Sequence, residues 1–131
     1  RQGYAVVVAI VVWGLAMVGF GVAALLAPHL PGMLAVAVLM LALGGAADMV
    51  SSAFRNAMLL SAADDSVRGR LQGIFMVVVA GGPRIADVAH GATAAVTGAA
   101  AAAAGGGVLV VIGVVLASLA VPAFVRYRAA R

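Results

Sequence analysis

Four long apolar stretches occupy most of this 131-residue chain, and they restrict what it can fold into. A helix needs roughly 20 apolar residues to cross the hydrocarbon core of a bilayer, and each stretch is at least that long. The chain is 66% hydrophobic and 9% charged, whereas a soluble domain is about half apolar and about a quarter charged. We therefore predict an all-α membrane protein with four transmembrane helices, over residues 4–26, 33–60, 71–97 and 105–125.

The segments between these stretches carry turn and loop signals. Residues 27–32 contain two prolines and a glycine, which favour a tight turn. Residues 63–70 hold most of the charge between the spans and are expected to lie in water. Residues 98–107 are only Gly and Ala, so they are compatible with a short turn and equally with a continuing helix.

A kink is expected in the third stretch, where Gly81, Gly82 and Pro83 follow one another. Pro83 has no N–H to donate to the carbonyl of Val79, and its ring crowds that carbonyl, so the helix should bend there. Such a bend is a candidate hinge for helix movement.

The arginines give an orientation. Six of them fall at the chain ends or in the second loop, on one side of a four-span protein: Arg1, Arg68, Arg70, Arg126, Arg128 and Arg131. Because loops rich in Lys and Arg stay in the cytoplasm, we place both ends of the chain and the loop 63–70 there. The chain starts with Arg rather than Met, and we expect it to be a segment of a longer protein.

Charged residues inside the apolar stretches are confined to the two middle ones. The second stretch contains Asp48 and Arg55, and the third contains Arg84, Asp87 and His90. Ionisable groups at membrane depth are costly unless they face a protein interior or a wet cavity. We therefore expect a polar path between the middle helices, which indicates transport.

Asp48 lies about 22 Å from the outer edge of its helix at 1.5 Å per residue, inside the hydrocarbon. There it could carry a proton or bind a cationic group. Alternatively, Ser51, Ser52 or a neighbouring helix satisfies Asp48, and Arg55 extends to lipid phosphates.

Arg84 and Asp87 are three residues apart and can pair on one helix face. Arg84 also lies within about 10 Å of the depth of Asp48, so a pair between these two helices is a hypothesis. Such a pair could equally be a structural lock, because many buried ion pairs are architectural. His90 is expected to be a packing or interfacial residue.

The composition argues against an enzyme. The chain has no Cys and no Glu, and its two His residues are isolated, so a disulfide framework, a metal site and a nucleophilic triad are not expected. Residues 81–83 lack the Lys and Ser/Thr of a phosphate-binding loop. We expect no cofactor and no nucleic-acid partner.

Three segments together resemble a known family. Residues 47–55, the loop motif Asp65, Arg68, Gly69 and Arg70, and residues 81–87 resemble a group within the major facilitator superfamily. That group includes the enterobactin exporter and related bacterial efflux permeases. The match would place the chain as spans nine to twelve of a twelve-helix transporter in the bacterial cytoplasmic (inner) membrane.

The resemblance implies proton-coupled efflux of drug- or siderophore-like molecules by alternating access. The second span would line the cavity with Asp48, Ser52 and Arg55, and the third, with Arg84 and Asp87, would face the other half. Asp48 and Asp87 would be the candidate proton carriers. The expected partners are the bilayer, the remaining N-terminal spans, a small-molecule substrate and protons.

A different class of function remains open. A complete four-span protein could be a small homo-oligomeric transporter, a channel or a structural membrane protein. Small multidrug transporters of this length carry a buried Glu in the first span. Residues 4–26 contain no acid, which argues against that version.

Overall fold

The structure is a computed structural model that describes residues 2–62 and 64–126, and all regular elements in those ranges are helices. Four are long: α1 (Gln2–Leu26), α2 (Met33–Ala62), α3 (Arg68–Thr97) and α4 (Ala99–Ala120); α5 (Pro122–Arg126) is short. All four long helices are long and apolar enough to cross a membrane, which confirms the prediction of an all-α chain with four helices of membrane-spanning length.

Helix α1 lies between α2 and α4. It packs along both of them, while α2 and α4 make no close backbone approach to each other. Small residues make this possible, because they let helix backbones come close where lipid removes the hydrophobic driving force. The buried residues of α1 are, with one exception, Gly or Ala: Gly3, Val6, Ala9, Gly14, Ala16, Gly21 and Ala23.

Helices α1 and α4 approach each other closely at Gly14 and Gly107. A Cβ added to Gly107 would lie 2.5 Å from the carbonyl oxygen of Gly14 and 2.9 Å from the nitrogen of Val18. No side chain fits at that distance, so glycine is required there by the neighbouring backbone.

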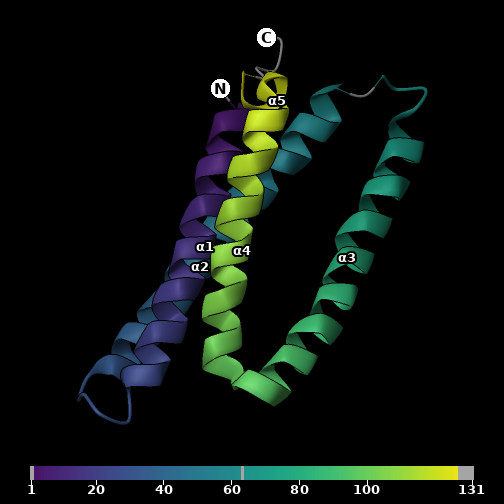
Figure 1. Cartoon of the computed structure of the whole chain (residues 1–131). Coiled ribbons are helices and arrows are strands. Elements are labelled where there is room, and N and C mark those ends of the chain that lie inside the picture. The colour runs from purple at the N-terminus through teal and green to yellow at the C-terminus, as the bar shows by residue number, and fades with distance from the viewer. Residues whose placement is uncertain (1, 63, 127–131) are drawn as a thin grey trace.

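Helix α3 stands apart from the other three (Figure 1). It touches α4 and, slightly, α2, and it has no close backbone approach to α1. None of its residues is buried. It runs without a break through Pro83, although proline removes one hydrogen bond from the helix interior.

One residue separates α3 from α4, and one residue separates α4 from α5. Gly98 has φ 88° and ψ 149°, a region that essentially only glycine occupies, and it alone separates α3 from α4. The Gly/Ala run that follows is therefore the first turns of α4. At the other end, Val121 interrupts the helix expected over 105–125, and Pro122 starts α5 as a first-turn proline.

The predicted turn at residues 27–32 is present. Gly32 has φ 88°, and the nitrogens of His29 and Leu30 donate to the carbonyl oxygen of Leu26 at 2.9 and 3.0 Å. This turn and Gly98 lie at one end of the helices, while the start of α1, α5 and the α2–α3 loop lie at the other (Figure 1). The described arginines at helix ends, Arg68, Arg70 and Arg126, are thus at the same end.

Candidate functional site

A pocket lined by charged and polar side chains lies on the face of α2 that carries Asp48, Ser51 and Arg55. These positions are separated by three and four residues, so they share one face of the helix. The pocket has a volume of about 210 Å³ and lies above α1, between α2 and α4. Its lining is completed by three apolar or aromatic side chains: Ile10, Trp13 and Val110.

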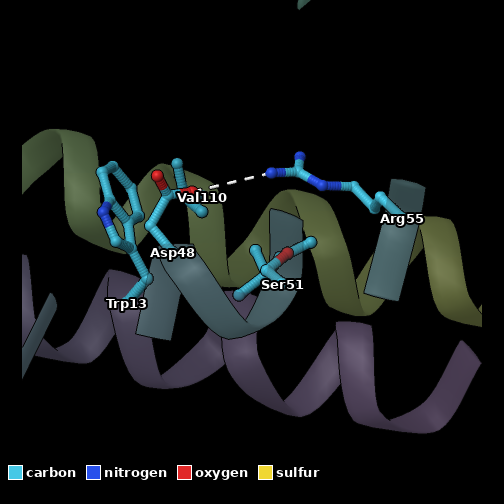
Figure 2. A pocket seen from close by; sticks show the side chains of 6 residues that line it. Trp13, Asp48, Ser51, Arg55 and Val110 are labelled. Atoms are coloured by element: carbon cyan, nitrogen blue, oxygen red, sulfur yellow. Dashed lines mark ion pairs between the residues drawn. The ribbon is translucent and has the colours of Figure 1, made fainter. Parts of the chain in front are cut away.

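An ion pair spans this pocket (Figure 2). Arg55 Nη2 lies 3.6 Å from Asp48 Oδ1, which is close enough for charge attraction but too long for a hydrogen bond. The side chains of Arg55 and Asp48 are 40% and 57% exposed. The pair is therefore loose, and the surroundings can reach both partners.

The guanidinium of Arg55 points along α2 towards Asp48 (Figure 2). A helical side chain leans towards the N-terminus of its helix, and Asp48 lies two turns in that direction. The Arg55 side chain thus follows the usual direction of a helical side chain, and its charged end lies beside Asp48.

Two buried polar atoms in the pocket have no hydrogen-bond partner among the described residues. They are Ser51 Oγ and Arg55 Nε. Ser51 is only 2% exposed, so its hydroxyl is not free to turn into bulk water. An unpaired buried donor costs about 1–3 kcal/mol, and a ligand with acceptor atoms in this pocket would remove that cost.

The other candidates on α2 and α3 do not join this pocket. Ser52 is half-buried and is not part of the lining. Arg84 and Asp87 are exposed on α3, and within the described ranges neither forms an ion pair with the other or with Asp48. Instead of the suggested pair between Asp48 and Arg84, the structure has the pair between Asp48 and Arg55 within α2.

The loop motif is ordered around Asp64 and Asp65. Arg68 Nη1 lies 2.6 Å from Asp65 Oδ1, and the nitrogens of Val67 and Arg68 each donate to the carbonyl oxygen of Asp64 at 3.0 Å. These contacts start α3. Gly69 and Arg70 are exposed in its first turn.

His90 lies where α3 meets α4. Its Nδ1–H donates to the carbonyl oxygen of Ala86 at 2.9 Å, and the opposite edge of the ring faces Gly106. A Cβ on Gly106 would lie 2.8 Å from His90 Nε2. This position agrees with the expectation of a packing residue. The described residues contain no group of three or more His, Cys, Asp or Glu that could hold a metal ion.

The sequence did not single out Ile10, Trp13 and Val110, and it named Ser51 only as a possible partner of Asp48. Ser51 follows Ala37 and Gly44 at intervals of seven, and all three are buried against α1. That spacing of small residues is a readable signal for a packed helix face. Trp13 gave no signal, because one aromatic residue in a uniformly apolar helix has no expected direction.

Comparisons of the chain with protein-family models, with curated proteins and with solved structures find no match.

Proposed function

We propose that this chain is part of a secondary active exporter that moves small molecules out of a bacterial cell in exchange for protons. The observation that carries the proposal is the pocket at Asp48 and Arg55, which holds a loose ion pair within a candidate membrane-spanning helix, beside an unpaired hydroxyl. Ionisable groups in such a position are the usual parts of a proton or substrate path. The resemblance of residues 47–55, 65–70 and 81–87 to bacterial efflux permeases gives the same function.

The proton step follows from the loose pair. A proton on Asp48 removes its negative charge and with it the attraction to Arg55. Because no hydrogen bond holds the two together at 3.6 Å, Arg55 is then free to change position. Protonation thus alters the charge and the shape of the pocket together, which alternating access requires of a coupling site.

The surface of α3 indicates that this chain belongs to a larger assembly. It has no buried residue and bears Arg84 and Asp87 on its surface. Charges on a helix that faces only lipid are costly, so other helices have to cover this one. We assign that role to the N-terminal spans of a twelve-helix major facilitator transporter, with α3 facing the other half. In the alternative arrangement, a second copy of a four-span chain would cover the same surface of α3.

The arginine-rich end then belongs in the cytoplasm. Arg68, Arg70 and Arg126 lie at one end of the helices (Figure 1), and cytoplasmic loops carry the excess of basic residues. In this orientation, Asp48 and Arg55 lie in the cytoplasmic half of the bilayer. A substrate from inside the cell would reach them from that side.

The test is export by the protein expressed from its native coding frame, in a bacterial strain that lacks its principal drug exporters. We expect lower accumulation of the fluorescent drug norfloxacin, or export of enterobactin, and loss of the effect when a protonophore collapses the proton gradient. Unchanged accumulation of both compounds would contradict the proposal. Sizing of the membrane-extracted protein separates the two assemblies: a single chain about three times longer supports the twelve-helix transporter, and an oligomer of short chains supports the alternative.

A further inference from the structure

The pocket between α1, α2 and α4 has two chemically different ends. The Asp48 carboxylate and the indole of Trp13 lie at one end, and the Arg55 guanidinium lies at the other, with Ser51 between them (Figure 2). A carboxylate beside an aromatic ring attracts cations, by charge and by the quadrupole of the ring. A guanidinium with an unpaired Nε–H and a neighbouring hydroxyl attracts acceptor groups.

A singly charged ligand fits this pocket poorly. A cation drawn to Asp48 would be repelled by Arg55, whose Nε would still lack an acceptor. An anion drawn to Arg55 and Ser51 would be repelled by Asp48. Only a ligand with both charges matches both ends, because the pocket itself has no net charge when Asp48 and Arg55 are ionised.

The size and the walls restrict the ligand further. The pocket volume of about 210 Å³ favours a small ligand. Ile10 and Val110 line the pocket beside the charged groups, and they would contact an apolar side chain. The loose pair at 3.6 Å loses no hydrogen bond when a ligand separates its partners.

We propose that this pocket binds a small zwitterion, with its ammonium group on Asp48 and Trp13 and its carboxylate on Arg55 and Ser51. An α-amino acid with an apolar side chain has this chemistry. The inference rests on the proposed export function and assigns a substrate class to the same site. Because a proton and an ammonium group compete for the Asp48 carboxylate, a zwitterion bound there would be exchanged for a proton.

The test is equilibrium binding of radiolabelled L-leucine to the purified full-length protein in detergent. Two analogues test the two charged groups of leucine separately. Leucinol keeps the ammonium group and lacks the carboxylate, whereas 4-methylpentanoate keeps the carboxylate and lacks the ammonium group. We expect each analogue to compete at least tenfold more weakly than leucine. Equal competition by leucinol would make this a cation site, and equal competition by 4-methylpentanoate an anion site; either result overturns the proposal.

Variants provide a second measure. Ser51→Ala should weaken leucine binding without changing competition by leucinol, which does not need the hydroxyl. Ser52→Ala is the matched control, since Ser52 is outside the lining. Absence of leucine binding in a protein that still exports norfloxacin overturns this inference and leaves the export function standing. Leucine binding without any proton-driven export supports the site and contradicts the export function.

Discussion

Asp48 and Arg55 face each other across two turns of α2 at 3.6 Å, without a hydrogen bond between them. The pair is surrounded by Ser51, which has no partner among the described residues, and by the apolar walls of the pocket. Under the proposed function, a proton or a ligand separates these two charges, which lie within a candidate membrane-spanning helix.

The first prediction concerns the contact between α1 and α2, referred to below as the seam, in which Ser51 is buried. This residue is 2% exposed and packs against α1, so Ser51→Leu should overfill the seam and destabilise the protein by about 1–3 kcal/mol. Ser52→Leu, one residue further and half-buried, should cost much less. Reversible unfolding of the detergent-extracted protein measures both. Equal losses for the two variants would contradict the placement of Ser51 in the seam.

The second prediction concerns the contact of α1 and α4. A Cβ on Gly107 would lie 2.5 Å from the Gly14 carbonyl oxygen, so Gly107→Leu should separate the helices and cost at least about 1–3 kcal/mol. Gly113→Leu is the matched control, because a Cβ there meets nothing within 4 Å. The same unfolding assay applies, and a stable Gly107→Leu protein would show that α4 does not pack on α1 in this way.

The third prediction concerns the joint between α3 and α4. Gly98 has φ 88° and ψ 149°, so Gly98→Ala should cost about 1–3 kcal/mol through backbone strain. Gly105→Ala lies within α4 in open space and should instead gain roughly 0.5–1 kcal/mol from helix propensity. In thermal unfolding, we expect a lower melting temperature for Gly98→Ala and a higher one for Gly105→Ala, each relative to the unsubstituted protein. A gain for both variants would mean that the chain continues as one helix through residue 98.

The fourth prediction concerns the position of α3 on α4. The His90 ring reaches the backbone at Gly106, and the sequence contains no Cys, so cysteines introduced in pairs can report this contact. His90→Cys with Gly106→Cys should cross-link with a short bifunctional thiol reagent, because the end of the His90 ring lies beside Gly106. Gly81→Cys with Gly106→Cys should not, because Gly81 is about 13 Å further along α3 at 1.5 Å per residue. Similar yields for both pairs would contradict the observed crossing.

The sequence predicted the four helices and the turn at residues 27–32 because hydropathy and turn residues act locally. It predicted that the two middle helices lie together with a polar path between them, whereas α1 lies between α2 and α4, and α2 touches α3 only slightly. The stretches that form α1 and α4 contain no charged residue, and helices that are apolar on all sides carry no hydrophobic face from which a direction can be read. The positions of Gly and Ala carry that information instead, as Gly14 and Gly107 show where α1 and α4 approach closely.

The sequence predicted only part of the candidate site, because it shows which residues are charged but not how the helices pack. Asp48 and Arg55 stood out as charges at membrane depth, and the structure brings them together. Ser52 was chosen over Ser51, since spacing alone puts both near that face, and only the packing against α1 separates them. The partner of Arg84 depends on how α3 sits relative to α2, and nothing local in the sequence sets that relation.

The measurement that tests the account most directly is proton-driven norfloxacin export by Asp48→Asn, in the protein expressed from its native frame. Asp64→Asn is the control, because it makes the same change at an exposed residue between α2 and α3. We expect Asp48→Asn to abolish export at an unchanged protein level and Asp64→Asn to retain it. Normal export by Asp48→Asn would show that this carboxylate does not couple the proton and would contradict the mechanism.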